Sequence, residues 1–266
     1  MRLQHIVLMC VLTFFWIWSL PLLCIACVFA FPTALVLLAA SLALSLAMQV
    51  YYHEQILVRH PIRVWISKIP WHEWFPCNRL KFDGPAIIGV HPHGLLCCGA
   101  VVGIHLVPES NTVLCVAPIL FYVPVIGWLL RVIGCIPARK TDMRLALKSG
   151  HALLVVPGGV PEIVLAETGD DRRRFPRHGF LRLCVGVPVV TVFVRGECKT
   201  YRMFRGPFLK QRVWLSWRFN VPLVMPILWG WRGTWLPRRV SLHLSCKKVT
   251  DPNSYDDTLL SLMEKS

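Results

Sequence analysis

The chain has 266 residues, of which 55% are hydrophobic, and it carries a formal net charge of +15. This length suits one globular domain of ordinary size together with an anchor. The mean hydropathy of +0.54 argues against a freely soluble domain. The eleven cysteines have no regular spacing, and three of them lie in a long apolar run. This pattern argues against a small disulfide-bonded secreted protein and favours reduced, cytosol-facing thiols.

The first predicted element is a membrane anchor. Residues 6–52 form a run of 47 residues without Asp, Glu, Lys, Arg or His, and one helical crossing of a bilayer takes about 20 residues. We therefore expect a transmembrane helical hairpin over residues 1–52, with arms near Ile6–Leu20 and Ala34–Val50. Basic residues flank both ends, and the positive-inside rule places them in the cytosol. A re-entrant hairpin is left open, and a cleaved signal peptide is the other interpretation, although its core would be shorter.

A connector and one folded domain follow the anchor. Residues 53–85 are rich in Trp and Pro, and we expect them to lie along the membrane surface. From residue 86 to 266, short apolar strands alternate with helical stretches, which favours an α/β sheet. Strands are expected at Ala86–Val90, Thr112–Val116, Ala152–Val156, Val187–Val194 and Val240–Leu244. Helices are expected at Leu95–Ile104, Val123–Ile133, Thr141–Ser149 and Phe180–Val185.

Two histidines follow the first expected strand, in the segment AIIGVHPHGLLCCGA at residues 86–100. We expect His93 where a strand ends and a helix begins, so that free helical N–H groups and the helix dipole disfavour an imidazolium. The neutral imidazole is the form that a general base needs. Pro92 would stiffen the turn, and Gly94 would let a substrate approach. A structural pair of His91 and His93 is the main alternative, and a His-x-His metal site lacks a convincing third ligand.

A glycine turn and a run of arginines follow the third expected strand. In LLVVPGGVPE, residues 153–162, the turn Pro157-Gly158-Gly159 would expose backbone amides, and Glu162 could orient a protonated histidine. A plain turn is the alternative interpretation. The segment RRRFPRHGF, residues 172–180, could receive phosphates, although such a run is usually a solvated face.

The stretch between Cys198 and Thr250 combines basic and aromatic residues. It holds eleven Lys or Arg, five Trp and no Asp or Glu. Indole rings favour the headgroup level of a bilayer and cations favour anionic lipids, so the pattern indicates a membrane interface. A nucleic-acid surface and a plain solvated face are the alternatives.

Several common enzyme classes lack their motifs in this chain. There is no GxSxG elbow of a serine hydrolase, no GxxxxGK[ST] phosphate loop and no GxGxxG dinucleotide fingerprint. No histidine has an aspartate five positions further on, which removes the His-x4-Asp dyad of glycerophosphate-type acyltransferases.

The motifs taken together resemble the type-2 diacylglycerol acyltransferase family, which includes monoacylglycerol and wax-alcohol acyltransferases. His91-Pro92-His93-Gly94, Pro157-Gly158-Gly159 with Glu162, and Arg177-His178-Gly179-Phe180 follow the order and spacing of that family. The segments Trp74-Phe75-Pro76 and GCIPARK, residues 134–140, resemble two further elements, so the likeness covers about residues 74–250. The chain departs from the family at Val194-Arg195-Gly196-Glu197, where members usually read Phe-Gly-Glu, and its tail after Thr250 is short.

The resemblance implies a membrane-anchored acyltransferase domain over residues 86–266, with a mixed sheet flanked by helices. It implies an enzyme that moves a fatty acyl group from acyl-CoA to the hydroxyl of a neutral lipid, with diacylglycerol as the first choice of acceptor and triacylglycerol as the product. His93 would take the proton of the alcohol, because an alcohol is a poor nucleophile at neutral pH. His91 would support the turn or exchange roles with His93, and Glu162 would orient the imidazole.

The resemblance also implies a substrate-binding set and a location. We expect acyl-CoA as co-substrate and no cofactor, metal or nucleic acid; the partners are a neutral lipid and the bilayer, and a homo-oligomer is left open. The endoplasmic reticulum membrane, with the catalytic domain facing the cytosol, is the expected location, and lipid droplets come second. A lysophospholipid acyltransferase and a non-catalytic hairpin protein of lipid droplets remain alternatives. Arg139, Lys140 and Arg172–Arg174 are candidates for the CoA phosphates. The full expected substrate-binding set is Pro92, Gly94, Arg139, Lys140, Pro157, Gly158, Gly159, Arg172, Arg173, Arg174, Arg177, Gly179 and Phe180.

Overall fold

The structure is a computed structural model that describes residues 39–40, 43, 61–108, 110–123, 125–175, 179–183, 186–221, 223, 228–234 and 236–265. The chain divides into two compact units, one of Met1–Ile69 with Cys115–Leu145 and one of Pro70–Leu114 with Ala146–Ser266. The arms of the expected hairpin lie outside the described residues, apart from positions 39, 40 and 43. Among the described residues, no helix has the length and hydropathy that a membrane crossing requires. The domain limits expected at residues 52 and 85 remain predictions.

The first unit is built from short elements. It contains α3 (Pro61–Ser67), the 3-10 helix η3 (Pro118–Phe121), α5 (Ile126–Val132), β3 (Cys135–Pro137) and most of α6 (Lys140–Lys148). Arg131 holds the turn before α5 together, because its guanidinium donates to the carbonyl of Gly127 at 2.9 Å and lies over the Phe121 ring at 5.3 Å. β3 lies beside the end of β2 (Thr112–Val116), where the Ala138 N–H donates to Val116 O at 2.8 Å.

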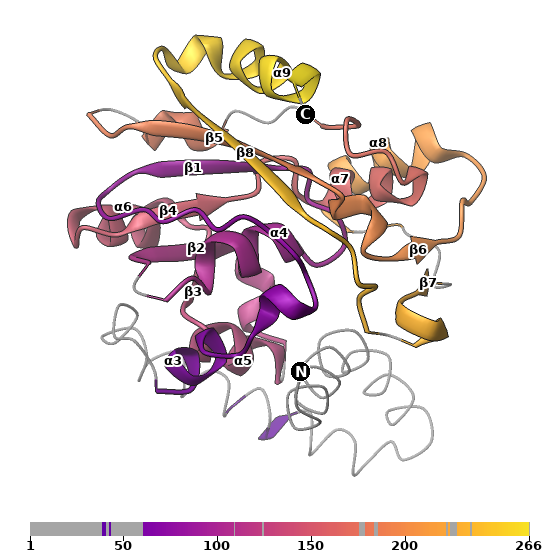
Figure 1. Ribbon diagram of the computed structural model, residues 1–266, viewed down its shortest axis with the longest axis horizontal. Helices are drawn as coiled ribbons and strands as arrows, with labels where there is room; N and C mark the ends of the chain where they lie inside the picture. The colour runs from indigo at the N-terminus through magenta and orange to yellow at the C-terminus, as the bar shows by residue number, and fades with distance from the viewer. Residues whose placement is uncertain are drawn as a thin grey trace. The chain divides into compact units, whose positions relative to one another are not determined.

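The second unit contains a mixed sheet whose strands run in the order β2-β4-β1-β5-β8 (Figure 1). β1 (Ile87–His91) is parallel to both β4 (Ala152–Val155) and β5 (Val189–Arg195), and β4 is parallel to β2. β8 (His243–Val249) pairs antiparallel with β5 along its full length. All five residues of β1 are buried, as expected for a central parallel strand with both faces covered. The expected mixed α/β sheet with flanking helices is confirmed.

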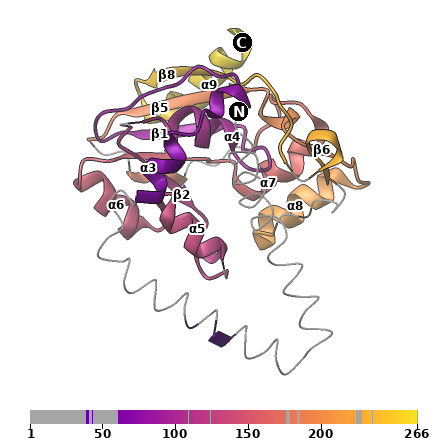
Figure 2. The ribbon, with the colours of Figure 1, turned by 60° about the horizontal axis from the view of Figure 1, so that its bottom comes forward.

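Helices and a small second sheet complete this unit. α4 (Cys98–Ala100) continues into the π-helix η2 (Val101–His105), and α9 (Tyr255–Lys265) packs on β5 and β8 (Figure 1). α7 (Gly159–Leu165), which runs on into the 3-10 helix η4 (Ala166–Thr168), packs against α8 (Leu209–Phe219). β6 (Arg202–Met203) pairs with β7 (Leu228–Trp229). α7, α8 and β6 lie together at one end of the large sheet in both views (Figures 1 and 2). The remaining 3-10 helices are η1 (Trp71–Glu73), η5 (Gly179–Leu183), η6 (Glu197–Lys199), η7 (Trp231–Gly233) and η8 (Pro252–Ser254).

The observed elements differ from the expected ones in several respects, and the short strands β3, β6 and β7 were also not expected. The helix expected from Leu95 begins only at Cys98, because Gly94 and Cys97 adopt positive φ angles of 57° and 51°, which a helix does not allow. The last strand is His243–Val249 and not Val240–Leu244. Most of its side chains are exposed, so it lacks the apolar run on which the expectation was based. α7, α8 and α9 were not expected.

The Trp-rich segment before β1 contributes to the core of the second unit. The side chains of Trp74 and Phe75 are buried, and Trp74 Nε1 donates to Pro237 O at 3.0 Å. Arg239 lies over the Trp74 ring at 4.6 Å from its centroid. Asn78 exchanges two hydrogen bonds with the backbone of Leu244. Residues 70–78 therefore brace β8 and the loop before it.

Candidate active site

His91 and His93 lie in the turn between β1 and α4. His91 is the last residue of β1, and His93 precedes the first residue of α4, Cys98, by five positions. The expectation that His93 lies at a helix N-terminus is therefore wrong. The N-terminal amides of α4 are bound by Glu197, whose Oε1 accepts from Cys98 N–H at 2.8 Å and whose Oε2 accepts from Gly99 N–H at 2.7 Å.

Glu162 is the centre of the polar network in this turn. Its Oε1 accepts from His91 Nδ1 at 3.0 Å and from Phe175 N–H at 3.0 Å, and its Oε2 accepts from His93 N–H at 2.9 Å. Burial alone would raise the pKa of Glu162. The electrostatic attraction of His91 and the hydrogen bonds from His91, Phe175 and His93 outweigh it, so that the pKa is lowered. Glu162 is therefore a carboxylate that can only accept hydrogen bonds.

The PGG turn allows Glu162 to take this position. Glu162 lies in the first turn of α7, and its side chain folds back over Gly158. A Cβ atom at position 158 would overlap the Glu162 carboxyl group. Glycine is therefore required at position 158 because it has no side chain. Its backbone conformation is not the reason, since a φ of −64° is accessible to any residue.

The two imidazoles have different surroundings. His91 is 2% exposed, its Nδ1 donates to the Glu162 carboxylate, and its buried Nε2 has no hydrogen-bond partner within the described residues. His93 is half-buried, and its Nδ1 lies 3.1 Å from Gly94 O. Because a carbonyl oxygen only accepts, this contact places a proton on Nδ1 and a lone pair on Nε2 of His93. Cys97 Sγ lies 3.2 Å from that Nδ1 and 3.7 Å from Nε2.

His93 is held in its neutral form. Desolvation lowers its pKa and outweighs the attraction of Glu162 and the hydrogen bond to Gly94, which raise it. The sequence led us to expect a neutral imidazole because of a helix dipole, whereas in the structure burial is the cause. Glu162, expected to orient the His93 imidazole, orients that of His91 and reaches His93 through its backbone N–H.

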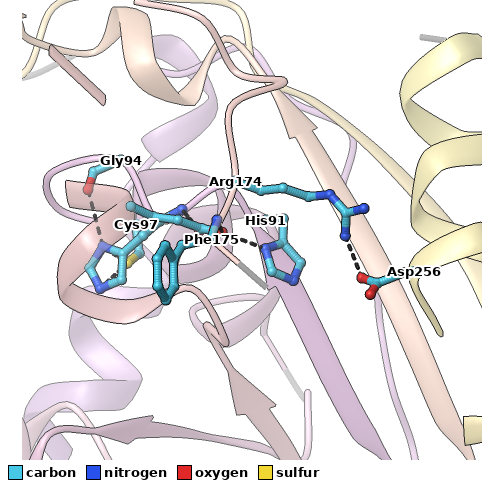
Figure 3. A network of polar contacts seen from close by, with 8 residues as sticks. His91, Gly94, Cys97, Arg174, Phe175 and Asp256 are labelled. Carbon is cyan, nitrogen blue, oxygen red and sulfur yellow. Dashed lines mark hydrogen bonds and ion pairs between the residues drawn. The ribbon is translucent and has the colours of Figure 1, made fainter. Parts of the chain in front are cut away.

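Aromatic residues pack behind His91. The ring of Tyr255, the first residue of α9, lies 6.1 Å from the His91 ring, and Phe180 packs edge-on against Tyr255 at 5.3 Å. The guanidinium of Arg174 pairs with Asp256, the next residue of α9 (Figure 3). Phe180 and Arg174 therefore contribute to the wall of the site through α9.

The other expected substrate-binding residues are spread over the fold. Arg172 and Arg173 are exposed and interact with Asp170, at 3.0 Å through the Arg172 backbone and at 3.7 Å through Arg173 Nε. In the first unit, Arg139 donates to Tyr122 Oη at 2.7 Å, and Lys140 begins α6. Pro92 and Pro157 are buried, Gly159 begins α7, and Gly179 is exposed at the start of η5. Arg177 lies outside the described residues.

Two buried carboxylates near the turn were not expected. Glu197 reaches the HPHG turn as well as α4, since a Cβ on Gly94 would lie 2.6 Å from its Cγ. Burial raises its pKa to about 8, against the opposing hydrogen bonds from Gly99 and Cys98. Asp171 accepts from Gly196 N–H at 2.6 Å and from Cys198 N–H at 2.7 Å, and thereby fixes the loop that carries Glu197. In the described part of the chain, no group of three or more His, Cys, Asp and Glu side chains could hold a metal ion.

An apolar groove of about 430 Å³ lies along α8, and we call it the α8 groove. Phe175 connects it to the site, because its backbone N–H binds Glu162 while its ring packs against Trp217 at 6.3 Å. Trp214 and Trp217 are 55% and 45% exposed. The groove is lined by Leu165, Arg173, Phe175, Leu209, Lys210, Val213, Trp214 and Trp217.

Comparisons with known proteins agree with these motifs. The sequence model of a family described as "Diacylglycerol acyltransferase" matches residues 31–244. Diacylglycerol O-acyltransferase 2-like protein 6 of Mus musculus is 28% identical over 159 residues, which cover 53% of this chain and 47% of that protein. Diacylglycerol O-acyltransferase 1 of Schizosaccharomyces pombe is 28% identical over 155 residues, which cover 50% of this chain and 45% of that protein.

A human protein and one solved structure add to the comparison. The human "DGAT1/2-independent enzyme synthesizing storage lipids" is 27% identical over 207 residues, which cover 74% of this chain and 59% of that protein. The chain thus spans about half the length of these curated relatives. The crystal structure of the 1-acyl-sn-glycerophosphate (LPA) acyltransferase PlsC from Thermotoga maritima aligns with a TM-score of 0.43 and 16% identity, over 86% of this chain and 92% of that one.

Proposed function

The chain belongs to the diacylglycerol acyltransferase family, and from this premise we propose that it is an acyl-CoA-dependent O-acyltransferase of neutral lipids. The acceptor that we propose first is diacylglycerol, which would give triacylglycerol; monoacylglycerol and a fatty alcohol are the next candidates. The observation that carries the proposal is the neutral, half-buried His93 imidazole beside the buried His91–Glu162 pair.

In the proposed reaction, His93 Nε2 takes the proton of the acceptor hydroxyl as its oxygen attacks the thioester carbonyl. The new ester C–O bond forms, the C–S bond breaks, and the thiolate of CoA receives the proton from the imidazolium. A base of this kind contributes roughly 10²- to 10⁴-fold. Because the thioester is already activated, no acyl-enzyme is required.

His91 and Glu162 act as positioning residues in this proposal. The Glu162 carboxylate fixes the His91 ring and, through its bond to the His93 amide, the backbone of the turn. The packing of Tyr255 against His91 supports the same geometry. A carboxylate so close to His93 also favours the imidazolium that forms during the reaction.

We propose that the α8 groove holds the acyl chain of the donor. Its lining is almost entirely apolar, and Phe175 links it directly to Glu162. A chain of about 15 methylenes carries about 12 kcal/mol of hydrophobic free energy at ~0.8 kcal/mol each. A groove that shields this chain beside the reacting carbonyl would remove most of the cost of taking it from a membrane into water.

The proposed reaction takes place at a membrane. Both lipid substrates are insoluble in water, and the uncharged run of residues 6–52 is long enough for two membrane crossings. We therefore propose the endoplasmic reticulum membrane as the location, with the catalytic domain facing the cytosol, and lipid droplets as a second location.

The experiment that tests the function offers radiolabelled acyl-CoA with each acceptor in turn to the full-length protein in microsomes. We expect His93→Ala to lose nearly all ester formation, at least 100-fold, while membrane association is kept. His243→Ala, which changes an exposed histidine on β8, is the matched control. Because burial lowers the pKa of His93, kcat/KM of the native protein should be flat near neutral pH and fall only below about pH 6.5.

Four outcomes would contradict the proposal. Full activity of His93→Ala would remove that imidazole from the mechanism. If only His91→Ala showed the large loss of ester formation that we expect of His93→Ala, the base would be assigned to His91. Acylation of a lysophospholipid in preference to every neutral acceptor would place the chain with the charged-acceptor enzymes. Absence of any ester would favour a non-catalytic lipid-droplet protein.

A further inference from the structure

A second and larger cavity lies next to α7, on the elements that follow it. Its volume is about 790 Å³. It is bordered by η4, by η6, by the two-stranded sheet of β6 and β7, and by η7. We call it the basic pocket after its five cationic side chains, Lys199, Arg202, Arg205, Arg232 and Arg238.

The charge of the basic pocket is not neutralised from within. Its one acidic lining residue, Glu167, is 5% exposed and is bound by the Arg212 guanidinium with two hydrogen bonds, of 2.8 and 2.5 Å. No ion pair joins any of the five cations to a carboxylate within the described residues. Five positive charges from two stretches of the chain, residues 199–205 and 232–238, therefore line one cavity, and their combined positive field would attract a multiply charged anion.

The fold holds these cations in place and adds aromatic surface. Arg205 donates to Thr168 O at 2.8 Å, and the Arg238 backbone N–H donates to Thr200 O at 2.7 Å. Arg202 stands opposite Trp229 across the β6–β7 sheet, and Trp229 is 46% exposed. Guanidinium groups bind phosphates through two parallel hydrogen bonds, and an exposed indole offers a face on which a purine can stack.

The basic pocket is close to the proposed catalytic turn and to the α8 groove. Ala166 follows Glu162 by four positions of continuous helix, which is about 6 Å along the axis. Leu165 lines the α8 groove and the next residue, Ala166, lines the basic pocket. The end of α7 therefore has an apolar groove on one side and a cationic cavity on the other, and Figures 1 and 2 show α7, α8 and β6 gathered at this end of the sheet.

We propose that the basic pocket binds the phosphorylated adenosine head of acyl-CoA, a nucleotide with a 3′-phosphate and a 5′-diphosphate. This inference rests on the proposed function, since it names the place of the donor in that reaction. It differs from the expectation based on sequence, which placed the CoA phosphates at Arg139, Lys140 and Arg172–Arg174. Arg174 is already paired with Asp256, and Arg172 and Arg173 lie beside Asp170 on the surface.

The test combines kinetics and direct binding on the full-length protein in detergent. We expect Arg202→Gln and Arg238→Gln to raise KM for acyl-CoA about tenfold each, because each loses a charge-assisted phosphate contact. The kcat and the KM for the lipid acceptor should not change. Arg202→Lys should recover part of the loss, and Lys248→Gln, which removes an exposed charge on β8, should have no effect. Adenosine 3′,5′-bisphosphate should compete with acyl-CoA in the native protein and more weakly in the two glutamine variants.

The outcomes separate this inference from the proposed function. An unchanged KM and undiminished competition in both glutamine variants would overturn the inference and leave the acyltransferase intact. If the two glutamine variants no longer bind phosphatidylserine vesicles, while adenosine 3′,5′-bisphosphate still competes with acyl-CoA in them as in the native protein, the cations would be assigned to a membrane surface. Absence of any ester in the native protein would overturn the proposed reaction. The nucleotide site would still stand if His93→Ala binds adenosine 3′,5′-bisphosphate saturably in a titration and the further change Arg202→Gln weakens that binding.

Discussion

The Glu162 carboxylate shows how much one side chain determines in this site. It accepts hydrogen bonds from the His91 ring and from the backbones of His93 and Phe175. These three donors come from the end of β1, the HPHG turn and the segment that borders the α8 groove. A change at Glu162 should therefore disturb the proposed base and the proposed acyl-chain site together.

Glu197 gives a prediction on the pH dependence of stability. Its pKa in the folded protein is about 8, well above the ordinary value of 4.5. Between these two pH values the folded chain keeps a proton that the unfolded chain releases, so the contribution of Glu197 to the free energy of unfolding is complete below about pH 4.5 and is lost as the pH rises through 8. Glu197→Gln, which stays neutral, should remove this slope.

Thermal unfolding in detergent at about pH 5 and about pH 8 measures this effect. The free energy of unfolding of Glu197→Gln minus that of the native protein should be greater at the higher pH than at the lower pH, by up to a few kcal/mol. Glu264→Gln, an exposed change on α9, is the control and should shift neither value. A native slope that Glu197→Gln leaves unchanged would show that the carboxylate is already ionised at the lower pH.

The sequence showed some of these residues and concealed others. His91, His93 and Glu162 could be found because polar residues interrupt apolar runs at strand ends. Glu197 could not be assigned its contacts, since it binds an amide 99 positions away, and Cys97 gave no sign of its left-handed backbone. The roles of His93 and Glu162 remain predictions.

At the scale of elements, α8 carries the most direct test. Trp217 packs on Phe175 in the α8 groove, so Trp217→Ala should lower the preference for long acyl chains over short ones, about tenfold in the ratio of their kcat/KM values at ~0.8 kcal/mol per buried methylene. The measurement is a series of acyl-CoA donors of increasing length. Phe219→Ala, at an exposed position of α8 outside the groove, is the matched control. Weaker binding to lipid vesicles with an unchanged chain preference would mean that the groove faces the bilayer.

The parallel strands could be predicted better than the helices. β1, β2, β4 and β5 are apolar and β-branched, and each lies within a few residues of its expected bounds. α8 was hidden by its composition, because its basic and aromatic residues suggested an interface rather than a helix. η2 is a π-helix, in which hydrogen bonds join residues five positions apart. This pattern leaves no distinct spacing of apolar residues in the sequence.

At the scale of the whole molecule, the membrane hairpin awaits its test. Leu12→Arg and Leu42→Arg each place a charge in one expected arm, at a cost of about 2.5–3.5 kcal/mol near the bilayer centre. The double variant should be extracted from microsomes by alkaline carbonate, whereas the native protein should remain in the pellet. The control is Arg2→Lys, which keeps the charge at the flank. A mature chain that begins after Ala30 would instead reveal a cleaved signal peptide.

The position of α9 has a consequence for the order in which the site forms during translation. Tyr255 lies against His91, and Asp256 anchors the segment that delivers Phe175 to Glu162. A ribosome makes these residues after every other part of the described site. A nascent chain can therefore form most of its sheet before the Tyr255 ring packs against His91, and the surroundings of His91 are complete only after α9 has been translated.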